Sequence, residues 1–323
     1  MIRWAILGAG TIARRFVASL AHEPRSVLVG ISRSSQERAE QFKAELKLDD
    51  TVRAYESHDE LIADDTVDAI YLALPHALHF EWAQRALLAG KAVLCEKPAC
   101  LNAQDMAALG ELAQQQHVLF MEAMKCRFVP IYREICTAAQ NLGEIERVET
   151  SLCNNMASAI EAAQSYHVQA GPGAGVLLDS GVYCASWIED YLPGIPELVS
   201  LDYELRKGVD YYIDAELTHG GFEAHLECAF DRAKPRQARI VGSRGFIVVE
   251  DLHRPQKATV YRDDAEPQLL EQPYEYDDFY GEISHFCDLM LAGHTESDIM
   301  PLKDSVHCAL ILDCIRAGIP ADE

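Results

Sequence analysis

The sequence contains no long apolar run and few basic side chains. Across its 323 residues, no stretch of about 18 apolar residues occurs, the length that a membrane-spanning helix needs. Lys and Arg total 28 against 51 Asp and Glu, which gives a formal net charge of −23. A chain this acidic, with no basic stripe, repels phosphate backbones. We therefore expect neither a membrane span nor a nucleic-acid partner.

Signals for secretion and for cysteine chemistry are also lacking. The N-terminal "MIRWAILGAG" leads from Met1 directly into a strand pattern, without the apolar stretch and cleavage site of a secretory signal. Ten cysteines occur, but none in a C-x-x-C pair, and a chain of this length does not depend on disulfides for folding. These features predict reduced, mostly buried thiols and a cytoplasmic location.

The pattern of apolar residues changes near residue 125, which predicts two domains. In residues 1–125, apolar runs such as "RWAILGAG", "SVLVGISR", "AIYLALP" and "AVLCEK" alternate with helical patterns. This alternation is typical of a Rossmann domain, a doubly wound parallel sheet covered on both faces. Residues 126–323 contain a succession of alternating strand patterns separated by Gly, Asp and Pro turns. They predict an α+β domain with a large, mostly antiparallel sheet, and the last helix, near 303–317, is the candidate to pack back on the first domain.

The turn after the first predicted strand reads "AILGAGTIARRF" and carries a G-x-G-x-x-A pattern. Gly8 permits the tight turn, Gly10 lets a pyrophosphate approach the backbone, and Ala13 lets the helix sit close to the sheet. The amides of Thr11 and Ile12 open the helix and would face the phosphates. The alternative is a turn that serves only the fold, but its place on the first strand of a βαβ unit favours a dinucleotide site.

The end of the second predicted strand indicates which dinucleotide is bound. NAD-binding domains carry an acid about 20 residues past the glycines, to hold the ribose hydroxyls. Here the strand ends in "GISRSSQER", with Ser32, Arg33 and Ser34 at its tip and Arg38 further on. A guanidinium can stack on adenine or pair with a 2′-phosphate. The pattern favours NADP and leaves NAD possible, the alternative being that Arg33 and Arg38 are ordinary solvated side chains.

The segment "KAVLCEKPAC" predicts a buried strand that ends in Glu96, Lys97 and Pro98. Such a charged pair belongs either to a surface loop or to a site. Ligands of open α/β sheets bind outside the carboxyl ends of the strands. A lysine at this position therefore points to an active site.

This segment and its surroundings resemble the family of glucose-fructose oxidoreductase, inositol dehydrogenase and MocA-like proteins. The resemblance rests on "PHALHFEWAQRALLAGKAVLCEKPACL", with a Pro and a His after the fourth strand, a helix ending in Ala-Gly-Lys and a strand ending in Glu-Lys-Pro. It extends from the glycine turn through the helix at Asp179, and more loosely to the C-terminus. The resemblance implies an NAD(P)-dependent oxidoreductase in which Lys97 lies beside the nicotinamide and the substrate. It also implies cofactor contacts for Leu74, Pro75, His79, Glu96 and Lys97.

A second family element, "GPGAGVLLDSGVYCASW", supplies Asp179 and Tyr183, which four-residue spacing places on one helix face. Many family members have His where this chain has Tyr183. With "MEAMKCRFVP", the tyrosine resembles the branch of dimeric dihydrodiol dehydrogenase and NADP-dependent D-xylose dehydrogenases. In that branch Lys, Asp and Tyr form the catalytic group. Lys125 departs from it, since a Trp near the nicotinamide is usual there, so the substrate stays open.

The catalytic group would transfer a proton while hydride passes between the substrate and the nicotinamide. Oxidation of a carbinol requires removal of its hydroxyl proton, and Tyr and Lys are both poor bases at their reference pKa of about 10. A phenol beside an ammonium gains by ionising, so Tyr183 would act as general base with Lys97 as its electrostatic partner. Asp179 would orient Lys97 or the substrate hydroxyl. A half-buried helix tyrosine without catalytic duty is the alternative for Tyr183 alone.

Four further residues are weaker candidates. Arg127 coincides with a family position near the cofactor, although a salt bridge at a domain boundary explains it nearly as well. Asn154 follows a strand end that could face the substrate, and Tyr276 and Phe279 could wall its pocket.

The pair His76 and His79 has no third ligand at helical spacing, so we expect no metal.

The sequence therefore predicts an NADP-dependent dehydrogenase acting on the CH–OH group of a sugar or vicinal diol. Two alternatives remain: a cofactor-binding sensor or regulator without turnover, and an NADPH-dependent reductase of imines or conjugated double bonds. Family members commonly pair through the second-domain sheet, which implies a homodimer here. The particular sugar or diol and the preferred direction are not determined by the sequence.

Overall fold

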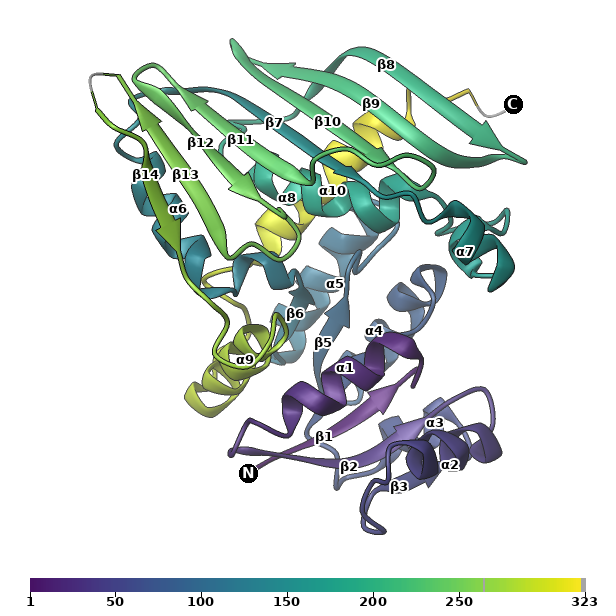
Figure 1. Cartoon of the computed structure of the whole chain (residues 1–323). Coiled ribbons are helices and arrows are strands. Elements are labelled where there is room, and N and C mark those ends of the chain that lie inside the picture. Colours follow the sequence, from purple (N-terminus) through teal and green to yellow (C-terminus); the bar gives the residue numbers. More distant parts are fainter. Residues whose placement is uncertain (264, 321–323) are drawn as a thin grey trace. The chain divides into compact units, whose positions relative to one another are not determined.

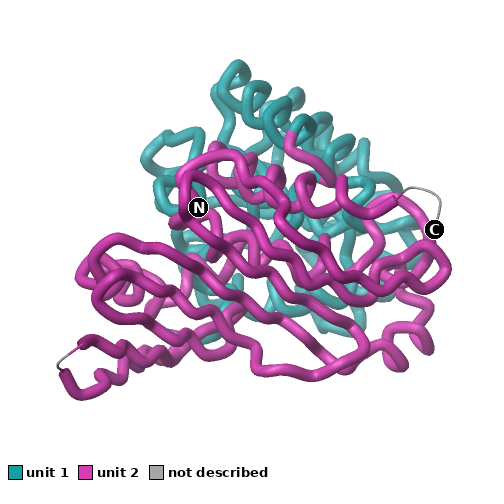
Figure 2. Tube along the Cα trace, turned by 90° about the horizontal axis from the view of Figure 1, so that it is seen from above, with its two compact units in different colours: residues 1–100, 104–123, 275–302 teal, residues 101–103, 124–274, 303–323 magenta. Residues whose placement is uncertain are grey.

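The computed structural model describes residues 1–263 and 265–320, which divide into two units (Figure 2). Unit 1 takes in residues 1–100, 104–123 and 275–302, and unit 2 takes in residues 101–103, 124–274 and the C-terminal segment from Lys303. The chain passes between the units after Ala123, and it returns to unit 1 for one late segment. No helix in the described ranges is long and apolar enough to cross a membrane.

Unit 1 is built on a six-stranded parallel sheet, which confirms the predicted Rossmann architecture (Figure 1). The strand order is β3-β2-β1-β4-β5-β6, so the direction of winding reverses between β1 and β4. The strands are β1 Ile2–Leu7, β2 Ser26–Ser32, β3 Arg53–Tyr55, β4 Ala69–Leu72, β5 Ala92–Glu96 and β6 Phe120–Ala123. The helices are α1 Thr11–Leu20, α2 Gln36–Glu45, α3 His58–Ala63, α4 His79–Leu88, α5 Ala103–Gln116 and α9 Tyr280–Ala292, with a short 3-10 turn η1 at His76–Leu78.

Helix α9 belongs to unit 1 because its side chains enter the core of this unit. Phe286 lies against Trp4 with ring centroids 4.9 Å apart, and Phe16 stacks on Tyr71 at 3.8 Å in the same core. Polar contacts reinforce the packing, since the Ser19 hydroxyl donates to Asp277 just ahead of α9 at 2.9 Å. A segment more than 150 residues beyond β6 therefore completes the first unit.

Unit 2 is built on an eight-stranded sheet of order β14-β13-β12-β11-β7-β10-β9-β8. All neighbouring pairs are antiparallel except β7 and β10, which confirms the predicted, mostly antiparallel sheet. The strands are β7 Ile145–Cys153, β8 Glu197–Arg206, β9 Val209–His219, β10 Phe222–Ala229, β11 Gln237–Gly242, β12 Gly245–Glu250, β13 Lys257–Arg262 and β14 Gln268–Glu271.

Helices of unit 2 lie on one side of this sheet, as Figure 1 shows for α6, α8 and α10. The helical elements are η2 Lys125–Arg127, α6 Pro130–Ala139, α7 Ala157–Ala162, η3 Tyr166–Val168, the π-helical turn η4 Leu177–Gly181, α8 Val182–Glu189 and α10 Leu302–Arg316. Helix α10 is fixed within unit 2, where His307 bonds the carbonyl oxygen of Gly194 at 2.8 Å and Arg316 donates to the carbonyl oxygen of Leu101 at 2.6 Å. Helix α9 belongs to unit 1, because it carries the aromatic side chains that the first core accepts.

Candidate functional site

Four loops of unit 1 lie at the same edge of the parallel sheet. They follow β1, β2, β4 and β5, which are neighbours in the order β2-β1-β4-β5. The carboxyl ends of parallel strands share one edge, and the reversal between β1 and β4 leaves a crevice there. The predicted cofactor residues of unit 1 are therefore gathered by the topology of the sheet.

The glycine turn has the backbone that its sequence predicts. Gly8 has φ of +97°, and a Cβ at this position would lie 2.6 Å from the carbonyl oxygen of Ala73, at the end of β4. Helix α1 begins at Thr11 with Gly10 as its N-cap and no side-chain cap, so its first amides are open to a ligand. The turn therefore has the close backbone approach and the exposed amides that a pyrophosphate requires.

Basic and hydroxyl side chains follow β2. Arg38 donates to the Ser34 hydroxyl at 3.2 Å, and Arg33 donates to the carbonyl oxygen of Arg38 at 3.4 Å. Neither guanidinium forms an ion pair within the described part of the chain. Ser32 behaves differently from the prediction, because its side chain is fully buried and its hydroxyl shares a 2.7 Å hydrogen bond with Nδ1 of His58. The Ser32 hydroxyl thus stabilises the end of β2, and the polar side chains left beyond this strand are those of Arg33, Ser34 and Arg38.

The Glu-Lys-Pro segment forms the loop after β5. The peptide bond between Lys97 and Pro98 is cis, and the Lys97 side chain is half-buried. The carboxylate of Glu96 is buried and accepts a hydrogen bond from the hydroxyl of Tyr71, on neighbouring β4. Burial raises the pKa of the nearby Cys95 and Cys100 thiols, so both stay protonated and neither is a nucleophile.

Two buried side chains hold this loop from opposite sides. His79 is fully buried at the start of α4, where Nδ1 lies 2.8 Å from the carbonyl oxygen of Pro98 and Nε2 lies 2.7 Å from that of Leu74. Glu122, on β6, accepts a hydrogen bond of 2.9 Å from the amide of Ala99. Both ring nitrogens of His79 face backbone carbonyls, so the ring positions the loops and has no nitrogen left for a cofactor or a metal ion. The sequence analysis missed Tyr71 and Glu122 because nothing local marks them.

In unit 2, Asp179 lies in the π-helical turn η4 directly ahead of α8. The turn follows Gly175, whose φ is +102° and where a Cβ would lie 1.8 Å from the Asp210 carboxylate. That carboxylate accepts a hydrogen bond from the amide of Leu177 at 2.7 Å and so caps the turn. Single π-helical turns inside helices occur frequently at functional sites. The predicted Asp179 therefore stands at a local irregularity that the glycine makes possible.

Tyr183 lies on α8, one turn beyond Asp179, and its side chain is mostly buried. Its ring meets that of His253 edge-on, with centroids 5.9 Å apart and an interplanar angle of 63°. His167 lies near Asp179, with Nδ1 4.0 Å from the carboxylate. His167 lies in the 3-10 turn η3 and His253 in the loop between β12 and β13, and neither has a helical spacing to Asp179 or Tyr183 that would have marked it.

Arg127 forms ion pairs, as in the salt-bridge alternative to the predicted cofactor contact. Its guanidinium is buried and faces three carboxylates, at 2.9 Å from Asp190 and Asp304 and in closer contact with Glu189. It also donates to the hydroxyl and the carbonyl oxygen of Ser186 at 2.9 and 3.0 Å. These partners lie on α8, directly after it and on α10, and they compensate the guanidinium charge inside unit 2.

The aromatic residues ahead of α9 are also placed differently from the prediction. Phe279 is buried in unit 1 with the guanidinium of Arg15 over its ring at 4.5 Å. Tyr276 stacks on His22 with centroids 4.2 Å apart. His22 follows the C-terminal end of α1, whereas the phosphate-binding amides open its N-terminal end. Tyr276 therefore lies near the opposite end of α1 from the phosphate-binding amides.

Asn154 remains a substrate candidate without further support. It directly follows β7, its side chain is half-buried, and its amide donates to the carbonyl oxygen of Ala229 at 2.9 Å. This bond extends the pairing of β7 with β10 by one residue.

The fold and these loops together define a class of protein: a two-unit oxidoreductase with a dinucleotide-binding Rossmann unit. The comparisons with known proteins identify the family. Residues 2–124 match the model of the oxidoreductase family with an NAD-binding Rossmann fold, and residues 136–248 match that of the GFO/IDH/MocA C-terminal domain. The chain belongs to the GFO/IDH/MocA family of oxidoreductases.

Relatives resemble the chain over its whole length. A scyllo-inositol 2-dehydrogenase (NADP(+)) of Bacillus subtilis is 32% identical and covers 100% of both chains. The trans-1,2-dihydrobenzene-1,2-diol dehydrogenase of Mus musculus is 30% identical over 98% of this chain and 97% of its own. Among solved structures, a 3-ketoreductase of Actinomadura kijaniata in complex with NADP and TDP-benzene superposes with a TM-score of 0.86, at 27% identity, over 98% of this chain and 97% of its own.

Proposed function

We propose that the protein is an NADP-dependent dehydrogenase that acts on a secondary or anomeric hydroxyl of a sugar or vicinal diol. The observation that carries the proposal is the lysine loop after β5, held by His79 and Glu122 at the same sheet edge as an uncapped glycine turn. The full-length relatives, named as inositol, dihydrodiol and ketone enzymes, support this substrate class.

The residues that would hold the cofactor follow from the geometry of unit 1. The amides of Thr11 and Ile12 would receive the pyrophosphate, and the tight turn at Gly8 leaves room for it. Arg33, Ser34 and Arg38 would pair with the 2′-phosphate of NADP, since two guanidiniums free of carboxylates suit a dianion. The bound nicotinamide supplies the hydride acceptor or donor.

We assign the proton to Tyr183, which would take it from the substrate hydroxyl during oxidation and return it during reduction. Lys97 would stabilise the phenolate and donate a hydrogen bond to the substrate oxygen, because an ammonium favours a nearby anion. Asp179 would orient the lysine or the hydroxyl. Solved structures of the 3-ketoreductase include variants with a lysine or a tyrosine replaced, the two side-chain types of this assignment.

Initial rates of NADPH formation with a panel of sugars and diols test this function. Wild-type protein should turn over at least one of them, Lys97→Met should lower kcat by orders of magnitude with little change in NADP affinity, and Tyr183→Phe should remove most of the rate. Lys257→Met and Tyr276→Phe are matched controls, since both side chains are exposed away from the loops described. Full activity of Lys97→Met would contradict the assignment, and NADP binding without turnover of any substrate would favour a sensor.

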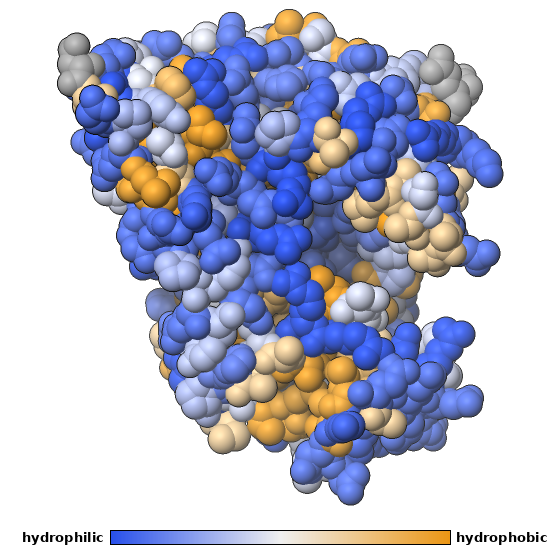
Figure 3. Space-filling view, viewed as in Figure 1, coloured by the Kyte–Doolittle hydropathy of each residue, from blue (hydrophilic) through white to orange (hydrophobic). Residues whose placement is uncertain are grey.

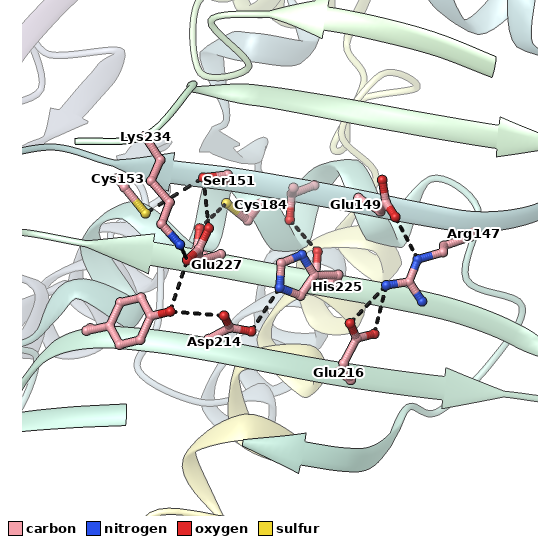
Figure 4. Close-up of polar contacts among 12 residues, drawn as sticks. Arg147, Glu149, Ser151, Cys153, Cys184, Asp214, Glu216, His225, Glu227 and Lys234 are labelled. Carbon is pink, nitrogen blue, oxygen red and sulfur yellow. Dashed lines mark hydrogen bonds and ion pairs between the residues drawn. The ribbon is translucent and has the colours of Figure 1, made fainter. Parts of the chain in front are cut away.

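We also propose a homodimer that forms through the outer face of the unit 2 sheet. The inner face is covered by the helices, whereas side chains of β7, β9 and β10 on the outer face form the polar network in Figure 4. Arg147 links Glu149 and Glu216, each at 2.9 Å, and Glu227 accepts from Tyr212 at 3.0 Å. Such an internally paired face can meet a second copy without leaving charges uncompensated.

Light scattering should therefore give twice the chain mass in dilute salt. The replacement of Arg147 by Glu should shift the equilibrium to the monomer, because it places four carboxylates together. Monomeric wild-type protein at micromolar concentration would exclude the dimer.

The ten cysteines are all free thiols, half-buried or buried, which supports a reducing compartment such as the cytoplasm.

A further inference from the structure

The loop between β12 and β13 places His253 against the helix that carries Tyr183. The indole of Trp187, on α8, donates to the carbonyl oxygen of Leu252 at 2.8 Å, and Leu252 itself is fully buried. The amide of Arg254 donates to the carbonyl oxygen of Asp251 at 2.7 Å, which closes a tight turn around His253. The loop is therefore closed around the histidine, and it is tied to the helix through Leu252, the residue before His253.

His253 and Tyr183 form an edge-to-face aromatic pair. Their ring centroids lie 5.9 Å apart with an interplanar angle of 63°, and each residue retains 8% of its accessible surface. Aromatic pairs prefer this arrangement and restrict the rotation of both rings. A phenol that must meet a substrate hydroxyl benefits from such restriction, since small errors of placement are costly in catalysis.

The hydrogen bond from Arg254 fixes which ring nitrogen of His253 carries a proton. Nε of Arg254 donates to Nε2 at 2.7 Å, so Nε2 carries a lone pair and the ring proton lies on Nδ1. The Asp251 carboxylate lies 3.6 Å from Nδ1 and is also paired with Arg236 at 2.9 Å. A second proton on the ring would break the bond from Arg254 and set two cations against each other.

We propose that His253, whose Nε2 accepts a hydrogen bond from Arg254, is a positioning residue that fixes the ring of Tyr183 for proton transfer. The proposal rests on the proposed function, because it takes Tyr183 as the general acid and base. His253 acts through the phenol and transfers no proton itself. The role differs from general packing, since it requires an aromatic edge at this position.

Three variants of the full-length protein test the role. His253→Ala should lower kcat about ten-fold or more and leave the dissociation constant of NADP unchanged, because the cofactor residues are in unit 1. His253→Phe keeps an aromatic edge and should retain kcat within about three-fold. Arg254→Ala should add an acidic limb to the pH profile of kcat near pH 6.5, about the ordinary pKa of His, because Nε2 can then be protonated.

His22→Ala is the matched control, because it also removes a His–Tyr ring contact, with Tyr276 in unit 1. It should change kcat by less than about two-fold. If His253→Ala and His253→Phe both keep the wild-type kcat while Tyr183→Phe is inactive, the proposal is wrong. Equal loss in both His253 variants also overturns it, since the aromatic edge would then be irrelevant. Should His253→Ala fail to fold, His253→Phe and Arg254→Ala still decide the matter.

One further measurement separates this proposal from the proposed function. Ultraviolet titration of the Tyr183 phenol, obtained by subtracting the curve of the corresponding Tyr183→Phe protein, needs no substrate. If Tyr183→Phe retains activity, the proposed function fails, and the contact is judged by this titration alone. His253→Ala should shift the phenol titration relative to wild type, and an unchanged curve would contradict the contact.

Discussion

Two single residues, Arg33 and Arg38, would select the nucleotide in the proposed function. Arg33 and Arg38 follow β2 without a carboxylate partner in the described ranges, although the chain as a whole has an excess of acids. A guanidinium bond to a phosphate contributes roughly 1.5–3 kcal/mol. Bonds from both side chains to a 2′-phosphate would therefore supply enough energy to distinguish NADP from NAD.

The double variant Arg33→Ala/Arg38→Ala should raise KM for NADP about 10- to 100-fold, because the 2′-phosphate loses both partners. KM for NAD should stay within about three-fold, since NAD lacks that phosphate. Initial rates with each cofactor measure both values. Arg85→Ala, in an exposed cluster with Glu81 and Asp59, is the control. An equal rise in KM for both cofactors would show that the two arginines serve the fold.

Glu122 shows how a buried residue can act on the site through the backbone. Its carboxylate accepts from the amide of Ala99, two residues beyond Lys97. Glu122→Leu should lower kcat about 10- to 100-fold with little change in KM for NADP, because a buried amide without an acceptor costs about 1–3 kcal/mol and the loop would move.

Glu122→Gln keeps an acceptor oxygen and should restore kcat to within a few-fold of wild type. Steady-state kinetics give the split between kcat and KM, and Glu111→Leu, on the exposed side of α5, controls for the change in polarity. A Glu122→Leu protein that binds NADP and turns over normally would remove Glu122 from the positioning of Lys97.

Elements of the chain are placed by a few backbone positions with positive φ. The turn between β1 and α1 depends on Gly8, where a Cβ would meet the backbone of Ala73 and Leu74 at 2.6 and 2.8 Å. The turn into η4 depends on Gly175 in the same way, with the Asp210 carboxylate as the obstacle. Both glycines allow an element that carries function to pack closely on its neighbours.

Gly8→Ala should weaken NADP binding more than ten-fold and lower the free energy of unfolding by about 2 kcal/mol or more. The left-handed backbone costs about 1–2 kcal/mol for a residue with a Cβ, and the clash with β4 displaces the turn. Isothermal titration and urea unfolding measure the two effects. Gly90→Ala is the control, since φ there is +72° but nothing lies within 4 Å. It should lose about 1 kcal/mol of stability and no cofactor affinity.

The arrangement of elements also explains which parts of the fold were predictable. Most strands of both sheets follow from apolar runs and alternation, which are local patterns, whereas the short strands β3 and β14 were not predicted. The assignment of α9 to unit 1 was not predictable, because it depends on Phe286 meeting Trp4. The same holds for the site, where spacing predicts the turn at Gly8 but not the partners of His79 and Arg127.

The whole molecule carries a net charge of −23, and its acidic excess reaches the interior. The face seen in Figure 3 is covered mainly by hydrophilic residues, where water screens the charges. Inside unit 2, however, the guanidinium of Arg127 meets three carboxylates. Burial raises the pKa of Asp190 to about 6, burial likewise raises that of Asp304, and the hydrogen bond to Glu189 raises the pKa of His307.

These raised pKa values mean that the folded state binds protons more tightly than the unfolded chain. The corresponding stability is present at low pH and is lost as pH rises through about 6 for Asp190 and through the raised pKa of His307. The free energy of unfolding should therefore fall by about 1–2 kcal/mol between pH 5 and pH 8. Urea unfolding at constant ionic strength measures this change.

Asp190→Asn keeps an oxygen for Tyr132 and Arg127 but cannot ionise, so its stability should vary less over the same range. His307→Gln should remove a further part of the dependence. Stability that rises from pH 5 to pH 8 in the wild-type protein would contradict the charge balance described for this network.

The sequence by itself determined the two kinds of sheet, the glycine turn and the positions of the candidate cofactor and catalytic residues along the chain. These features depend on backbone conformations and periodicities that a few neighbouring residues set. Only the tertiary structure decided that Arg127 forms buried ion pairs and that His253 lies against Tyr183. It also decided that His79 and Glu122 hold the loop that carries Lys97. Each of these pairings joins side chains far apart in sequence, and their energies depend on burial and distance, which no local pattern contains.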